Sequence, residues 1–140
     1  MTNRFDDGQI VAYEYLWNWQ AKEGRTNGEK SRPVCLALQI KDARQNLTHL
    51  VILPISSTPP RADQEALLIP PLELHRAGLS EFKDGWITVS EFNYDVLERS
   101  FYFQPNQKPR GRFSKPFMDQ ILIRLRRHIA SGQGRTDRTK

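Results

Sequence analysis

The chain has 140 residues and a formal net charge of +5, and 38% of its residues are apolar, which suits one domain with its own core. No apolar stretch approaches the roughly 20 residues of a membrane-spanning helix, and the amino-terminal segment lacks the apolar run of a signal peptide. Cys35 is the only cysteine, so an internal disulfide is excluded and we expect a cytoplasmic protein.

The first third of the chain predicts three strands and one long loop. Gln9–Tyr15, Val34–Ile40 and Leu47–Ile55 are apolar and rich in β-branched or aromatic residues, as is typical of strands. The segment Leu16–Ser31 between the first two strands is polar and contains two glycines, so it predicts a long loop or a hairpin tip. Loops longer than about 12–15 residues inside compact domains are often functional.

The middle of the chain predicts shorter elements. Ala66–Ile69 reads as a brief strand, and Pro71–Ala77 as one or two helical turns that stop at a glycine. Trp86–Phe92 alternates and predicts a strand, and Ser100–Phe103 predicts one more. Five or six short strands around one small core favour a strongly bent, barrel-like antiparallel sheet.

A helix is predicted near the end of the chain. Ser114 suits its N-cap and Pro116 its first turn, and Gly132 ends it. Apolar residues at helical spacing give it one buried stripe: Phe117, Ile121, Leu122, Leu125 and Ile129. We therefore predict a single barrel domain over residues 1–131 and a basic disordered tail over 132–140.

The positive charge is concentrated in the carboxyl-terminal part of the chain. Residues 110–140 carry nine Lys/Arg and two Asp/Glu, whereas residues 1–109 carry twelve and fourteen. The high isoelectric point therefore does not indicate a basic groove on the body of the domain. Such a tail could attract nucleic acid, but solubility is the slightly favoured interpretation.

Several kinds of catalytic site are not indicated. His49, His75 and His128 are far apart in the sequence and lack other ligands at metal spacing, so no metal is expected. The sequence has neither a phosphate-binding glycine motif nor a nucleophile elbow, and Cys35 within a strand is a poor nucleophile. An enzyme with this sequence would work without a cofactor.

Two strand ends carry polar side chains suited to phosphate. Arg32 precedes the second strand, and Ser56, Ser57 and Thr58 follow the third. Neighbouring antiparallel strands would bring these ends to one rim, where a guanidinium and hydroxyls match phosphate oxygens. The alternatives are a solvated strand boundary at Arg32 and turn-forming polarity before Pro59-Pro60.

The long loop carries Trp17 and Trp19. Two aromatic side chains in a polar loop can stack on bases, and they can equally fold back on the core.

These pieces, in this order, resemble the MazF/PemK family of toxin endoribonucleases. The matching stretches are GQIVAYEY at 8–15, SRPVCLAL at 31–38 and HLVILPISST at 49–58, with an outline match over 78–93 and in the final helix. The resemblance spans roughly residues 8–130. It implies an SH3-like small barrel of five to seven short antiparallel strands with a C-terminal helix, and a homodimer. It also implies metal-independent cleavage of single-stranded mRNA and a cognate antitoxin protein that lies across the RNA groove.

The resemblance assigns roles to particular residues. The family's active-site arginine falls on Arg32, and its hydroxyl residue falls on Ser56 with Ser57 beside it. The loop Leu16–Ser31 corresponds to the one that borders the RNA. The candidate substrate-binding residues are Trp17, Trp19, Lys30, Thr58, Glu91 and Asn93.

The sequence departs from the family in the strand after Trp86. Many members have Asp-Gln and then, one residue later, Arg where this chain reads Ser90-Glu91-Phe92-Asn93. The acidic position falls on Ser90, and Glu91 would face the opposite side of a strand. This departure leaves two alternatives open: a catalytically inactive barrel of the same family that binds nucleic acid or a protein, and an unrelated β-barrel interaction module.

The chemistry of RNA cleavage suggests a mechanism for the first interpretation. The 2′-hydroxyl of RNA attacks the adjacent phosphorus, leaving a cyclic phosphate and a 5′-hydroxyl. Arg32 would stabilise the charge on the phosphorane, and Ser56 would hold a phosphate oxygen. A guanidinium is effectively always protonated, so an electrostatic role is favoured over proton transfer. DNA lacks the 2′-hydroxyl and should survive.

Overall fold

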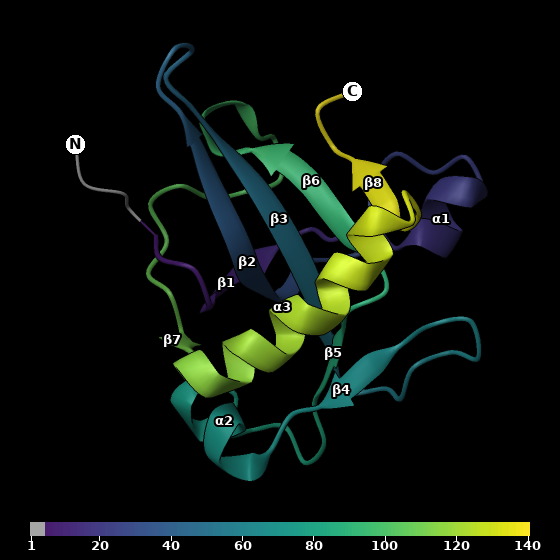
Figure 1. Ribbon diagram of the computed structural model, residues 1–140, viewed down its shortest axis with the longest axis vertical. Coiled ribbons are helices and arrows are strands. Elements are labelled where there is room, and N and C mark those ends of the chain that lie inside the picture. Colours follow the sequence, from purple (N-terminus) through teal and green to yellow (C-terminus); the bar gives the residue numbers. More distant parts are fainter. Residues whose placement is uncertain (1–4) are drawn as a thin grey trace.

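Strand β3 (Leu47–Ser56) is the centre of the sheet in the computed structural model, which describes residues 5–140. One of its edges pairs in antiparallel fashion with β2 (Arg32–Asp42). Its other edge is shared, first by β6 (Phe92–Val96) and then by β5 (Trp86–Thr88). The sheet curls into a half-barrel around the point where the edge of β3 passes from β6 to β5 (Figure 1).

The outer elements extend the sheet on both sides. Beyond β2 lie β1 (Gln9–Tyr13) and β7 (Gly111–Arg112), and beyond β5 lies β4 (Ala66–Leu68). Strand β8 (Arg135–Asp137) pairs with β6 in parallel. The helices are α1 (Asn18–Lys22), α2 (Pro71–Arg76), a 3-10 turn (Leu97–Arg99) and α3 (Lys115–Ala130). No helix among residues 5–140 is long and apolar enough to cross a membrane.

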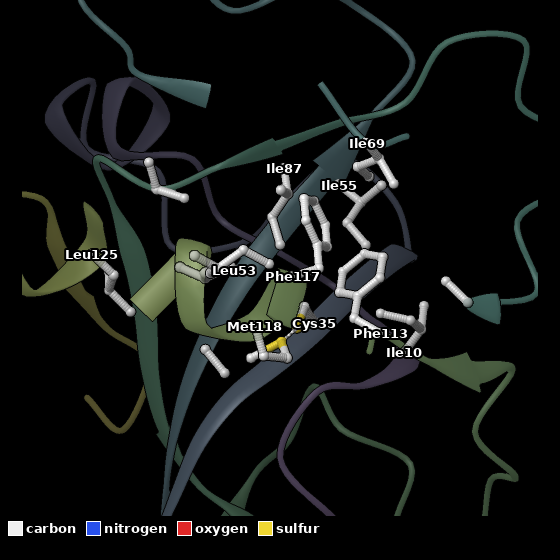
Figure 2. Close-up of a cluster of buried hydrophobic side chains, with 14 of the residues drawn as sticks. Ile10, Cys35, Leu53, Ile55, Ile69, Ile87, Phe113, Phe117, Met118 and Leu125 are labelled. Carbon is white, nitrogen blue, oxygen red and sulfur yellow. Dashed lines mark hydrogen bonds between the residues drawn. The ribbon is translucent and has the colours of Figure 1, made fainter. Parts of the chain in front are cut away.

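The central strands bury side chains on both faces of the sheet. Because successive side chains of a strand alternate, Cys35 and Leu53 pack under α3, which crosses one face of the sheet (Figures 1 and 2). Leu36 and Ile52 enter a second core on the opposite face, which Phe103 helps to cover. This arrangement explains why β2 and β3 are nearly continuous apolar runs, as is typical of strands buried on both faces.

Helix α3 confirms the helix that was predicted near the end of the chain. Ser114 is its N-cap, and the Ser114 hydroxyl oxygen accepts a hydrogen bond from the Phe117 amide at 3.3 Å. Phe117, Ile121 and Leu125 are buried against the sheet, whereas Ile129 is exposed because the helix passes the edge of the core there. The expected helical turns at α2 are also present.

Three sequence-based predictions about the elements are wrong. The strand predicted over Trp86–Phe92 is two strands, because β5 and β6 pair with different parts of β3. The strand predicted over Ser100–Phe103 is a bend with one isolated bridge from Phe103 to Tyr13. The segment Leu16–Ser31 is not loop throughout, since it contains α1.

The tail and the strand count also differ from expectation. Residues 135–138 are not disordered, because β8 completes the edge of β6 and Arg138 is buried beneath it. Residues 5–140 form eight strands, one of them parallel, rather than five to seven antiparallel ones. A strand only three residues long, rich in polar side chains, has no periodicity by which sequence alone could reveal it.

Candidate functional site

The ends of β2 and β3 place Arg32 and Ser56 at one rim of the sheet. Val34 pairs with Pro54 across the two strands. The same antiparallel register, continued by two residues, brings Arg32 alongside Ser56. The two polar strand ends predicted to meet do so, and both line one cleft.

This cleft has a volume of about 490 Å³. Its walls are the long loop after β1, the start of β2, and the segment that follows β3. It brings together most of the residues that the sequence proposed for a site: Trp17, Trp19, Lys30, Arg32, Ser56, Ser57 and Thr58. Residues separated by as many as 41 positions in the chain (Trp17 and Thr58) thus share one surface, which only the pairing of β2 with β3 makes possible.

Arg32 is the half-buried cation of the cleft. Its guanidinium carbon lies 5.3 Å from the centre of the Trp17 ring. Its Nε is buried and has no hydrogen-bond partner among residues 5–140. Burial lowers the pKa of Arg32, and the neighbouring carboxylate of Glu29 partly opposes that shift. A buried donor without a partner is costly, so this nitrogen is suited to an acceptor oxygen brought by a ligand.

The hydroxyl groups sit in a tight turn at the end of β3. The Ser56 Oγ accepts a hydrogen bond from the Thr58 amide at 3.0 Å. This bond uses an oxygen lone pair and leaves the hydroxyl hydrogen available to donate. Ser57 and Thr58 are exposed in the same wall. The turn-forming and ligand-binding interpretations of Ser56 are therefore compatible.

The two tryptophans combine packing with exposure to the cleft. Trp17 packs edge-on against buried Tyr15, with 5.3 Å between ring centres. The Trp19 ring lies 4.7 Å from the Arg61 guanidinium carbon and 5.5 Å from that of Arg25. Both indoles thus hold cations next to the cleft, an arrangement that favours stacked, negatively charged ligands.

Glu91 does not line the cleft, contrary to its assignment as a substrate-binding residue. It is buried, and burial raises the pKa of its carboxyl group. Its Oε1 accepts hydrogen bonds from the Tyr15 hydroxyl (3.1 Å) and the Asn18 amide (2.9 Å). Its Oε2 accepts one from the Gln64 side chain at 3.3 Å. Glu91 therefore holds segments that form the cleft walls and does not line the cleft itself.

Asn93 is also a buried support and not a cleft residue. Its Oδ1 accepts from the Leu16 amide at 2.9 Å, and its Nδ2 donates to the Leu16 carbonyl oxygen at 2.7 Å. These two bonds fix the entry of the long loop. No local pattern predicted this role, because Leu16 and Asn93 are 77 residues apart in the chain.

Other residues of the cleft were missed by sequence reasoning. Arg61 and Gln64 follow the two prolines after Thr58, and Glu29 precedes Lys30. Arg61 could have been predicted as a cleft residue, because it is a cation in the same loop as the three hydroxyl residues. Three cations and one carboxylate line the cleft, so its charge favours an anion; Glu29 is itself paired with Arg25 at 3.2 Å.

The histidines lie in separate places. The His49 ring stacks on Tyr94, and the His128 Nε2 lies 3.0 Å from a Glu65 carboxylate oxygen. Across residues 5–140, no three His, Cys, Asp or Glu side chains converge as a metal site. The chemistry that the cleft can offer comes from a guanidinium, hydroxyls and aromatic faces.

No family model, curated protein or solved structure matches this chain. The fold and the cleft define it as a mainly β half-barrel whose cationic, hydroxyl-bearing cleft lies at the ends of its two central strands.

Proposed function

We propose that this protein is the toxin component of a type II toxin–antitoxin system, a metal-independent endoribonuclease of the MazF/PemK kind built on an SH3-like barrel. The observation that carries the proposal is the position of Arg32. Its unpartnered Nε, the Ser56 hydroxyl and the two tryptophans share one cleft. A phosphodiester with an adjacent base is the ligand class that uses all of these groups.

In this mechanism the 2′-hydroxyl oxygen of the substrate attacks the adjacent phosphorus, and the bond to the 5′-oxygen of the next nucleotide breaks. Arg32 donates to a non-bridging phosphate oxygen and stabilises its growing negative charge. Ser56 donates to the same phosphate and fixes the direction of attack. The products are a 2′,3′-cyclic phosphate and a 5′-hydroxyl, and no metal ion takes part.

The attacking hydroxyl must lose a proton. Arg32 is poorly suited to accept it, because a guanidinium stays protonated even when burial lowers its pKa. Glu29 supplies a carboxylate to the cleft lining, and its pairing with Arg25 keeps that carboxylate on the loop. We assign proton acceptance to Glu29 in this scheme, and a water molecule supplies the proton that the leaving 5′-oxygen needs to become a hydroxyl.

The proposed partners follow from the same family resemblance. They are single-stranded mRNA, a cognate antitoxin protein that covers the cleft, and a second copy of the chain. Light scattering at micromolar concentration should give about twice the monomer mass of 16.3 kDa. A single monomeric species would remove the dimer from the proposal.

The second candidate function is binding without cleavage, to nucleic acid or to a protein. One observation favours binding without cleavage. The position that is acidic in the family is Ser90 here, and the Ser90 Oγ accepts a hydrogen bond from the Glu65 amide at 3.0 Å. The nearby carboxylate of Glu91 is buried and satisfied by the loop. In this case Arg32 and the tryptophans would hold a strand that the protein does not cut.

The test is incubation of purified protein with several long single-stranded RNAs of varied sequence in excess EDTA. Arg32→Ala and Ser56→Ala are compared with the parent, and a DNA of matching sequence is the substrate control. We expect cleavage of RNA only, with cyclic-phosphate ends, and a loss of about 10²–10³-fold in rate for Arg32→Ala. Ser56→Thr keeps the hydroxyl and should retain most of the activity.

Two other results would contradict the proposal. If all of the RNAs survive but bind in an Arg32-dependent manner, the protein is a binding module. If RNA is cut equally well by Arg32→Ala, the assignment of the site is wrong.

A further inference from the structure

Residues 134–138 add a strand to the sheet along the edge of β6. Strand β8 pairs in parallel with β6, with Asn93 opposite Thr136, and lies beside α1 (Figure 1). The Gly134 carbonyl oxygen accepts from the Phe92 amide (2.9 Å), and the Arg138 amide donates to the Tyr94 carbonyl oxygen (2.8 Å). These bonds extend the pairing one residue beyond each end of β8.

The approach at Gly134 is too close for a side chain. Its φ is +83°, and a Cβ there would lie 2.4 Å from the Ser90 carbonyl oxygen. Only glycine allows this backbone conformation and this contact together. The first residue of the docked segment is therefore matched to the surface that receives it.

Arg138 is buried beneath the segment. Its side chain is 1% exposed, and its guanidinium carbon lies 3.7 Å from the centre of the Tyr102 ring and 5.5 Å from that of Tyr13. Its Nη1 donates to the Glu14 carbonyl oxygen at 2.5 Å and to Asn93 Oδ1 at 3.0 Å. A buried cation is tolerated only where such acceptors are in place.

The two residues that accept from Arg138 each also hold one leg of the cleft loop Leu16–Ser31. Asn93 holds the backbone of Leu16, where the loop begins. The Glu14 carboxylate accepts from the Gly28 amide at 2.9 Å, where the loop returns, and lies 3.8 Å from Arg138 Nη2. One guanidinium thus connects the carboxyl-terminal segment to both legs of the loop that carries Trp17 and Trp19.

We propose that the edge of β6, together with the Tyr102 ring and the adjacent Tyr13, is a binding site for an extended, arginine-bearing peptide segment. Its occupant is residues 134–140 of this chain. Arg138 is a positioning residue: when it is docked, the loop Leu16–Ser31 is held in the conformation that places the tryptophans in the cleft. The consequence for RNA rests on the proposed function, whereas the consequence for the loop does not.

The test is amide hydrogen exchange, resolved by residue, on the full-length protein. In Arg138→Ala we expect the amides of Leu16 and Gly28 to exchange at least tenfold faster, while those of Leu36 and Ile52 in the central strands stay unchanged. Arg138→Lys should behave like the alanine variant, because an ammonium group lacks the planar guanidinium face that stacks on the Tyr102 ring. Arg135→Ala, an exposed arginine of the same strand, is the matched control and should leave the loop unchanged.

Two further measurements separate positioning from general damage. Millimolar ethylguanidinium should slow loop exchange again in Arg138→Ala, and ethylammonium should not. Gly134→Ala, which keeps Arg138 but obstructs docking against Ser90, should loosen the same two amides. Unchanged loop exchange in Arg138→Ala, or equal acceleration in Leu36 and Ile52, would overturn the inference.

RNA cleavage provides an independent readout. If the proposed function holds, Arg138→Ala should raise KM more than it lowers kcat, because the loop binds the strand while Arg32 is untouched. If neither parent nor variants cut RNA but loop exchange follows the expected pattern, the proposed function fails and the role of the carboxyl-terminal segment stands. If RNA is cut with unchanged KM and loop exchange is also unchanged, the inference fails and the proposed function stands.

Discussion

Arg32 lies over the ring of Trp17, with 5.3 Å between the guanidinium carbon and the ring centre. The pair joins the first residue of β2 to the loop that precedes α1. Stacking on the indole uses the face of the guanidinium and not its edge, which carries the N–H donors that suit an anion. Two residues from different elements therefore form one surface, which can hold a base and a phosphate together.

Replacing Trp17 tests this surface directly. Trp17→Ala should weaken binding of a 2′-O-methyl RNA, which cannot be cleaved, by about 1–3 kcal/mol, the usual contribution of one stacked base. Fluorescence anisotropy at fixed salt measures the change. Phe101→Ala is the control, because Phe101 is 94% exposed and lies outside the cleft. Equal effects of the two variants would argue against a specific stack on Trp17.

Arg61 should contribute through its charge. It lines the cleft and contacts Trp19, so Arg61→Ala should weaken RNA binding for every sequence. One lost phosphate contact should reduce the slope of log K against log salt by about 0.7 for a single strand. Arg127→Ala removes an exposed cation from α3 and should leave both affinity and slope near those of the parent. An unchanged slope in Arg61→Ala would place the phosphates elsewhere.

Glu65 should make stability depend on pH at the acidic end. Its hydrogen bond with His128, helped by Arg124, holds the pKa of Glu65 below its ordinary value of 4.5 despite partial burial. The folded state thus binds fewer protons than the unfolded state in this range. Its contribution is complete above the unfolded value and is lost as pH falls through the lower folded value.

The measurement is urea unfolding of the parent and Glu65→Gln across that range. The difference in unfolding free energy should be at most about 1 kcal/mol at neutral pH, because the pair is partly exposed, and should vanish in acid. Glu23→Gln, at an exposed position, is the control. A difference that persists at low pH would mean that the glutamine disturbs packing rather than an ionised contact.

Ile121 should show how strongly α3 is held on the sheet. It is fully buried in the core that also contains Phe117 and Leu125, so Ile121→Ala should lower the free energy of unfolding by about 2–5 kcal/mol. Ile123 on the same helix is 55% exposed, and Ile123→Ala should change it by less than about 0.5 kcal/mol. Denaturant melts with equal m-values would allow the comparison. A similar decrease in the free energy of unfolding for both variants would contradict the burial of Ile121 against the sheet.

Local patterns predicted the central strands and the last helix because each depends on neighbours in sequence. The apolar runs of β2 and β3 and the Ser114 cap of α3 are examples. The meeting of Arg32 with Ser56 was also predictable, since antiparallel pairing brings the start of one strand to the end of the next. The burial of Glu91 and Asn93 was not, because it depends on where the long loop crosses β6.

The sequence by itself determined which residue types stand at the strand ends and that β2 and β3 are apolar strands, because hydrophobic patterning is a local property. Only the tertiary structure decided that β3 shares one edge between two strands, that Arg61 joins the cleft, and that Arg138 is buried under β8. Each of these depends on contacts between segments far apart in the chain. Such contacts form when distant backbone edges and buried donors find partners, and no window of neighbouring residues contains that information.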